Sequence, residues 1–185
     1  MTGRMIESSA ILTKRKIEKL VSEFNPSNEL IRDELPLNEE FEVFVSHSSS
    51  DLEFIKKVIL FLKYSKGGIN AYVDWLDPSM KRETDAQTAI ELKRRIKNSK
   101  KIIYVVTHES LKSVWCSWEI GYADRDKGTN KIAILAIKPN NGRWKCYEYL
   151  EQYPWISYDI KDKIFKVYSP NGDTITLSDW LHTKE

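Results

Sequence analysis

The sequence predicts an α/β fold in which a mostly parallel sheet is covered by helices on both faces. Short apolar runs alternate along the chain with amphipathic helical patterns, which is the rhythm of strands joined by crossover helices. Two of these runs, residues 102–106 and 131–137, are almost continuously apolar, as is typical of strands buried on both sides. The composition, 41% hydrophobic and 30% charged, is that of a globular protein with a real core.

The first 40 residues are expected to form a helical extension followed by a linker. Helical spacing of apolar residues extends from about residue 6 to residue 24. The apolar positions are Ile11, Ile17, Leu20 and Val21. An Asn-Pro pair at residues 25–26 ends the pattern, and the polar stretch up to Glu40 is typical of a linker.

The first strand is predicted at residues 41–45 and ends in Ser46-His47-Ser48. Residues 50–53 fit a capping box, in which the Ser50 hydroxyl would cap the helix that follows. That helix is expected to bury one stripe, formed by Leu52, Ile55, Ile59 and Leu62.

The remaining elements continue the alternation. A second strand at 69–74 leads into a long loop, residues 75–83, and a second capping box at 84–87 opens the next helix. The inner face of this helix is predicted to consist of Ala89, Leu92 and Ile96. Further strands are predicted at 101–106, 131–137 and 155–158, with a helix from Trp115 to about Asp126 and a weak helix near 147–152.

The chain departs from this rhythm after residue 160. Segments at 164–168 and 174–177 flank the turn sequence at 170–173, which predicts a β-hairpin, and a short helix from Ser178 is expected to close the core. We therefore divide the chain into an N-terminal extension (1–40), a central domain (41–160), and a C-terminal hairpin and helix packed on that domain (161–185).

Composition excludes several classes of partner. The net charge of +2 is too small to indicate a nucleic acid, and no apolar run approaches the roughly 20 residues of a membrane helix. The first 16 residues lack the apolar region of a secretory signal. The two cysteines, Cys116 and Cys146, show neither metal-ligand spacing nor a disulfide framework. These features favour a location in the reducing cytoplasm.

Common catalytic motifs are missing from the sequence. There is no GxGxxG after the first strand and no P-loop. His47, His108 and His182 lack the spacing of metal ligands, so no metal site is expected. Ser46 and His47 do not form a hydrolase pair, because neighbours on a strand point to opposite faces.

Glu119 is the candidate for chemistry. It lies one helical turn after Trp115, so the carboxylate and the indole share a helix face, and it follows the apolar strand 102–106. The carboxyl edge of a parallel sheet is where α/β proteins bind ligands. On these grounds alone, a helix-surface position beside tryptophans that belong to the core is the favoured interpretation of Glu119, and a ligand site is the alternative.

Three blocks of this sequence together resemble the TIR (Toll/interleukin-1 receptor) domain family. They are residues 41–48 with Asp51, residues 73–75 before the long loop, and residues 110–119, in the order and spacing of the family between about residues 41 and 158. The resemblance implies a flavodoxin-like fold with a five-stranded sheet. It also implies similarity to the small bacterial TIR enzymes of Thoeris-type antiphage defence.

The resemblance also implies roles for particular residues. Glu119 matches the family's catalytic glutamate, and Trp115 matches the tryptophan four residues before it. Ser46, His47 and Ser48 match the loop that lines the nucleotide pocket, and residues 75–83, beginning with Trp75, match the BB loop that gates the pocket and joins neighbouring domains. The charges Lys81-Arg82 in this loop differ from those of the receptor adaptors, so receptor-type partnerships are not expected.

The function implied is that of an NAD nucleosidase or ADP-ribosyl cyclase. NAD is then the substrate, no cofactor or metal is needed, and a cyclic ADP-ribose signal is expected to act on a separate effector protein. The alternatives are a plain hydrolase that depletes NAD, a non-catalytic TIR–TIR interaction module, and a relative of the nucleoside 2-deoxyribosyltransferases. Self-association through TIR–TIR contacts is expected in each TIR case.

Overall fold

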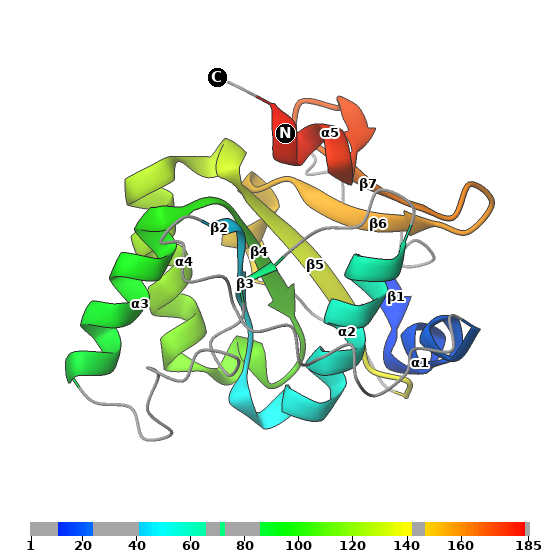
Figure 1. Cartoon of the computed structure of the whole chain (residues 1–185), viewed down its shortest axis with the longest axis horizontal. Helices are drawn as coiled ribbons and strands as arrows, with labels where there is room; N and C mark the ends of the chain where they lie inside the picture. Colours follow the sequence, from blue (N-terminus) through cyan, green and yellow to red (C-terminus); the bar gives the residue numbers. More distant parts are fainter. Residues whose placement is uncertain (1–10, 24–40, 66–70, 73–85, 142–146, 184–185) are drawn as a thin grey trace.

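The centre of the molecule is a sheet with the strand order β3-β2-β4-β5-β6-β7-β8, in which β1 also pairs with β5 (Figure 1). The computed structural model describes residues 11–23, 41–65, 71–72, 86–141 and 147–183. The strands are β1 Leu12–Thr13, β2 Phe41–Ser46, β3 Ala71–Tyr72, β4 Ser99–Val106, β5 Ile132–Lys138, β6 Trp155–Asp159, β7 Ile164–Tyr168 and β8 Thr174–Thr176.

Five strands pair in parallel in the order β3-β2-β4-β5-β6. This is the order of the flavodoxin-like doubly wound sheet, so the predicted fold class is confirmed. The α-helices are α1 Lys14–Glu23, α2 Leu52–Tyr64, α3 Ala86–Asn98, α4 Val114–Lys127 and α5 Leu177–His182. Short 3₁₀ helices occur at η2 Ser49–Asp51, η4 Ser110–Lys112, η5 Thr129–Lys131 and η6 Glu148–Gln152.

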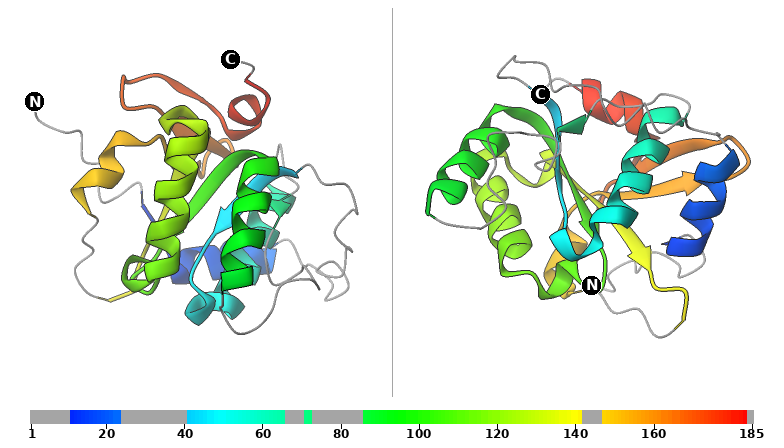
Figure 2. Two further views of the ribbon diagram at one scale, coloured as in Figure 1. Left: turned by 90° about the vertical axis from the view of Figure 1, so that its left-hand side faces the viewer. Right: turned by 60° about the horizontal axis from the view of Figure 1, so that its bottom comes forward.

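Two hydrophobic clusters cover the two faces of the sheet, because successive strand residues point to opposite sides. On one face, α1, α2 and α5 pack against residues such as Val45, Ile103 and Leu135. On the other face, α3 and α4 pack against residues such as Tyr104 and Ile134. Figure 2 shows α3 and α4 side by side, away from α1 and α2. The central strands are therefore buried on both sides, as their continuous apolar runs predict.

The predicted C-terminal hairpin is present and extends the same sheet. β7 pairs with β6 and β8 pairs with β7, both antiparallel. Gly172 adopts a φ of 101° in the connecting turn, a conformation that glycine accepts without strain. Because β7 covers the edge of β6, the sheet continues beyond the five strands that the resemblance implies.

The N-terminal extension differs from its prediction at its start. A helix was expected from about residue 6, but Leu12 and Thr13 form a strand that pairs in parallel with Ile137 and Lys138 of β5. The helix begins only at Lys14 and buries Ile17 and Val21. A strand of two residues is too short to produce an alternating pattern, so periodicity does not reveal it.

The start of α2 also differs from the prediction. The N-cap of α2 is Asp51, which makes no side-chain capping bond. The Ser48 hydroxyl instead accepts the Ser50 amide at the start of η2, and Glu53 pairs with Lys56 instead of reaching back. The buried stripe is rotated as well and consists of Phe54, Ile55, Val58, Phe61 and Leu62. The first two residues of the second capping box, 84 and 85, and the linker before residue 41 lie outside the described residues.

Candidate active site

The topological switch point of the sheet lies between β2 and β4. The chain leaves β2 toward α2 on one face and leaves β4 toward α4 on the other. In open α/β sheets, ligands bind in the crevice that such diverging connections create at the carboxyl ends of the strands. The residues that follow β2 and β4 therefore define the candidate active site.

Ser46 and Glu119 meet at this edge. Ser46 is the last residue of β2, and its hydroxyl donates a buried hydrogen bond of 2.5 Å to Oε2 of Glu119. The glutamate side chain is directed inward and is only 7% exposed. Glu119 is therefore not a helix-surface residue. The arrangement is a buried carboxylate, oriented by a hydroxyl, beside the switch point.

The first turn of α4 is defined by a side-chain cap. The Ser113 hydroxyl accepts a hydrogen bond of 3.3 Å from the Cys116 amide, which satisfies one of the otherwise unpaired amides of the helix start. Cys116 is buried in the core, as expected of a small apolar side chain. The cap therefore fixes the helix that carries Glu119.

Three aromatic side chains of α4 precede and follow Glu119 in the chain and pack on one another. Trp115 meets Trp118 edge to face at 5.6 Å between ring centroids, and Trp118 stacks on Tyr122 at 5.9 Å. Both tryptophans are partly buried against the α3 and α4 core. The predicted role of Trp115 as a wall of the substrate pocket stays a prediction, since its described ring partner is Trp118.

The predicted pocket residues after β2 are close to Ser46 in the chain but have different local partners. A ring nitrogen of His47 lies 3.1 Å from the carbonyl oxygen of Val45. The Ser48 hydroxyl caps η2. Trp75 and the rest of the predicted BB loop lie outside the described residues. Glu119, Ser46, His47 and Ser48 thus remain the candidate site that the structure describes.

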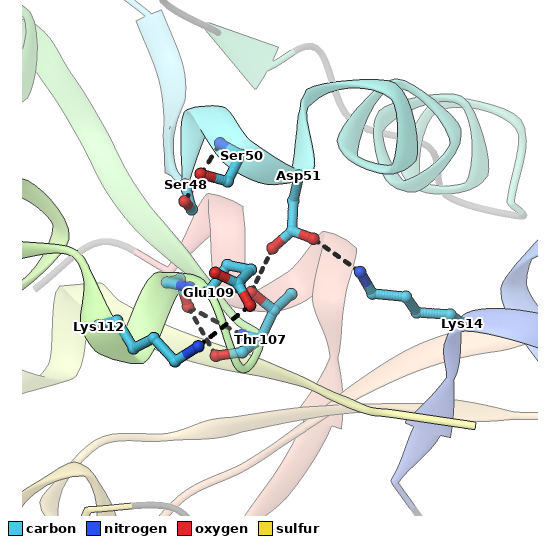
Figure 3. Close-up of polar contacts among 8 residues, drawn as sticks. Lys14, Ser48, Ser50, Asp51, Thr107, Glu109 and Lys112 are labelled. Atoms are coloured by element: carbon cyan, nitrogen blue, oxygen red, sulfur yellow. Dashed lines mark hydrogen bonds and ion pairs between the residues drawn. The ribbon is translucent and has the colours of Figure 1, made fainter. Parts of the chain in front are cut away.

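A buried network beside this site was not predicted from the sequence (Figure 3). The Asp51 carboxylate accepts a hydrogen bond of 2.5 Å from the Thr107 hydroxyl and pairs with the Lys14 ammonium at 2.6 Å. Asp51 follows β2 and Thr107 follows β4, so their bond spans the switch point. Asp51 appears in the sequence only as part of a motif, and nothing in the sequence points to Lys14 as its partner.

A separate hollow of about 430 Å³ lies on another side of α4. It is lined by Leu111, Ser117, Ile120, Gly121, Tyr147, Tyr149 and Tyr153. Gly121 is two residues from Glu119, which places it about 200° around the helix. This hollow is therefore distinct from the candidate active site. Within the hollow, burial is the main cause that raises the pKa of Tyr153, and the nearby Asp124 carboxylate raises it further.

Two further findings concern the described part of the chain. No group of His, Cys, Asp and Glu side chains within it is arranged to hold a metal ion. None of its helices has the length and apolar character needed to cross a membrane.

Comparisons with known proteins point to one family. A family model described as TIR domain matches residues 43–166. A protein of Bacillus cereus (strain MSX-D12), named "Probable 3' cyclic ADP-D-ribose synthase ThsB'", is 30% identical over 154 residues, which cover 78% of this chain and 77% of that protein.

Two further matches cover less of one chain or the other. A protein of Cytobacillus dafuensis, named "Putative cyclic ADP-D-ribose synthase TIR2", is 39% identical over 97 residues, which cover 51% of this chain and 25% of that protein. The crystal structure of the TIR domain of a Toll-related receptor, TRR-2 of Hydra magnipapillata, aligns with a TM-score of 0.46 and 17% identity, covering 66% of this chain and 87% of that one.

Proposed function

This chain belongs to the TIR domain family, and from this we propose that it cleaves the nicotinamide–ribose bond of NAD and closes the ADP-ribose part into a cyclic product. The observation that carries the proposal is the buried Glu119 carboxylate, held by the Ser46 hydroxyl at the switch point of the sheet. Two relatives with names of cyclic ADP-D-ribose synthases support the nature of the product.

The chemistry needs a carboxylate in this environment. As nicotinamide leaves, the ribose develops oxocarbenium character, as a sugar does in glycoside hydrolysis. Nicotinamide departs as a neutral molecule, so no general acid has to protonate it. A negative charge in a site that excludes water stabilises the developing positive charge more strongly than it would in solution. We assign this role to Glu119.

Ring closure then requires an internal nucleophile. A hydroxyl of the adenosine ribose attacks the anomeric carbon that nicotinamide has left, the new C–O bond forms, and the hydroxyl proton is released. NAD is thereby converted to cyclic ADP-ribose, nicotinamide and a proton. The name of the Bacillus cereus relative makes the 3' hydroxyl our choice of nucleophile. Holding this hydroxyl against the anomeric carbon gives the entropic advantage of an intramolecular reaction.

We assign the remaining residues to substrate binding. Ser46, His47 and Ser48 would line the pocket from the β2 side, while Trp115 and Trp75 would contribute apolar walls. Trp115 is partly buried and is the second residue of α4, which follows β4 and η4 in the chain. Walls of this kind limit the access of water, which would otherwise give linear ADP-ribose.

We further propose a role in bacterial antiphage defence. A cyclic nucleotide diffuses, so its receptor can be a separate effector protein. TIR domains associate with one another, and we expect association of this chain to raise its activity. The loop 75–83, with its Lys81-Arg82 pair, is our candidate for the contact.

The decisive experiment is analysis of the products formed from NAD by the purified protein. We expect nicotinamide and a compound that weighs one water less than ADP-ribose in mass spectrometry. Glu119→Gln keeps the shape of the side chain but removes its charge, so nicotinamide release should fall by roughly 100-fold or more with the fold intact. Glu109→Gln, at a partly exposed glutamate that pairs with Lys112, is the matched control.

Three results would change the proposal. Linear ADP-ribose as the sole product would leave a hydrolase that depletes NAD. Near wild-type nicotinamide release by Glu119→Gln would remove the carboxylate mechanism. Complete stability of NAD with concentrated wild-type protein would favour the non-catalytic interaction module.

A further inference from the structure

Asp51 holds a carboxylate inside the molecule at the carboxyl ends of β2 and β4. Its side chain is 3% exposed, and both oxygens are engaged: Oδ1 by the Lys14 ammonium and Oδ2 by the Thr107 hydroxyl. Figure 3 shows Lys14 and Thr107 approaching Asp51 from opposite sides. A buried carboxylate is costly unless it is paired and hydrogen-bonded, so Asp51 depends on both partners.

We propose that Lys14, from the N-terminal extension, is a positioning residue for the reaction: by pairing with Asp51 it keeps the Asp51–Thr107 bond in place and thereby fixes the segment that leads into the Glu119 helix. This inference rests on the proposed function. Lys14 lies outside residues 43–166, which match the family, so the extension adds a charge that the matched region does not contain.

The path from Asp51 to Glu119 is a series of short contacts. The Thr107 hydroxyl, which donates to Asp51, also accepts the Ser110 amide at 3.0 Å. The Ser110 hydroxyl accepts the Thr107 amide at 2.8 Å, and the Ser110 carbonyl accepts the Ser113 amide at 3.1 Å. Ser113 caps α4, and Glu119 follows in the second turn. A shift of Thr107 is therefore transmitted to the start of the helix that carries the carboxylate.

The β2 side of the site depends less on Asp51. The turn between Ser48 and Asp51 is held by a backbone hydrogen bond of 3.0 Å, and Ser48 also accepts the Ser50 amide. Loss of the Lys14 charge should therefore disturb the placement of Glu119 more than that of the substrate-binding residues on the β2 side, Ser46, His47 and Ser48. The expected kinetic result is a lower kcat with little change in KM.

Lys14 does not hold the extension in place by itself. Leu12, Ile17 and Val21 are buried in the core, and Leu12 pairs with Ile137 of β5. The Arg15 amide donates to the Asn140 side chain at 2.8 Å. Lys14 is itself about one-third exposed and lies over the Phe54 ring at 4.9 Å. Replacement by methionine keeps the apolar stem, so the extension should stay docked.

The test compares two lysine variants that each remove one ion pair between α1 and the segment around α2. Lys14→Met removes the pair with buried Asp51, and Lys57→Met removes the surface pair of 2.8 Å with Glu18. We expect kcat for NAD cleavage to fall about 10- to 100-fold in Lys14→Met, the loss that a misplaced reacting group typically causes, with KM within about twofold of wild type. Lys57→Met should keep wild-type kinetics, and Lys14→Arg should restore most of the rate.

A double variant separates positioning from simple loss of stability. Asp51→Asn keeps an oxygen that accepts the Thr107 hydroxyl but removes the charge that Lys14 compensates. Lys14→Met with Asp51→Asn should therefore be more active than Lys14→Met alone, a coupling that a double-mutant cycle measures. A double variant as poor as the single one, or a wild-type kcat in Lys14→Met, would overturn the proposal.

Hydrogen exchange gives a readout that does not depend on activity. Amides at 110–113 should exchange faster in Lys14→Met than in wild type, while the amides of β4 should exchange at the wild-type rate in this variant. In Lys57→Met, exchange at 110–113 should equal that of the wild type. Unchanged exchange at 110–113 refutes the positioning role even if the wild-type protein proves inactive on NAD. Failure of the proposed function and failure of this inference are thus distinguishable.

Discussion

The hydroxyl of Ser46 donates a 2.5 Å hydrogen bond to the carboxylate of Glu119, joining the end of β2 to the second turn of α4. The two residues are 73 positions apart in the chain, and both are buried. Serine at the end of a strand and glutamate in a helix are common. Their direct contact at the switch point orients the Glu119 carboxylate in a buried environment with little access to water.

The first prediction concerns Ser46. Ser46→Ala should lower kcat/KM for NAD about 10- to 100-fold, because a hydrogen bond to a charged group contributes roughly 1.5–3 kcal/mol. Steady-state kinetics of nicotinamide release measures the change. Ser117→Ala, at an exposed hydroxyl of the same helix that donates to the Ser113 carbonyl, is the control and should keep the wild-type rate. Equal rates for wild type and Ser46→Ala would mean that the contact does not serve the reaction.

A second prediction concerns the cap of α4. Ser113→Ala and Thr176→Ala each remove the hydroxyl that caps a helix, α4 and α5 respectively, so each should cost about 1 kcal/mol of unfolding free energy. Only Ser113→Ala should also lower kcat, since only α4 carries Glu119. Urea unfolding combined with kinetics separates the two effects. A similar loss of kcat in both variants would attribute it to stability alone.

The third prediction addresses assembly. Lys81→Glu with Arg82→Glu should reduce turnover without changing the unfolding midpoint of the monomer, because the charges are proposed to act in a contact between neighbouring domains. The control is Lys161→Glu with Lys163→Glu, which reverses two exposed charges in the turn between β6 and β7. Activity per molecule that is high and independent of protein concentration would exclude assembly from the switch.

The fourth prediction tests whether residues 161–185 share the core of the central domain. Trp180 is 4% exposed, and its indole donates a hydrogen bond of 3.1 Å to the Asn130 carbonyl. Trp180→Ala should cost about 3–5 kcal/mol, whereas Trp180→Phe should cost about 1 kcal/mol for the lost hydrogen bond. Thermal unfolding should stay a single transition in both. A separate early transition in Trp180→Ala would show an independent C-terminal unit.

The parallel sheet could be predicted from the sequence because its strands are buried on both faces. A run such as 102–106 is continuously apolar, so the sequence identifies it as a strand buried on both faces. The observed strand β4 contains this run and extends from Ser99 to Val106. The C-terminal hairpin could be predicted from its turn residues for a similar reason. Both signals are local, so neighbouring residues are enough to detect them.

Other features depend on contacts that no local pattern records. The two-residue strand β1 exists because β5 offers an open side near Ile137, and Lys14 meets Asp51 only because that pairing places the extension there. The buried stripe of α2 includes Phe54 and Phe61 in place of the predicted Leu52 and Ile59, because the two phenylalanines pack in the core. The spacing after Trp115 singled out Glu119 and the resemblance implied its role, but its bond to Ser46 became visible only in the fold.

The pairing of β1 with β5 has a consequence for the order of events during synthesis. Arg15 and its partner Asn140 are 125 positions apart, so the extension leaves the ribosome long before the strand that receives it. Contacts of such separation form late, because a long loop must close first. The extension is therefore among the last of the described segments to complete its strand pairing, although Lys14 and Asp51 are only 37 positions apart. A truncated chain that lacks β5 would therefore carry Glu119 without the strand that receives the extension.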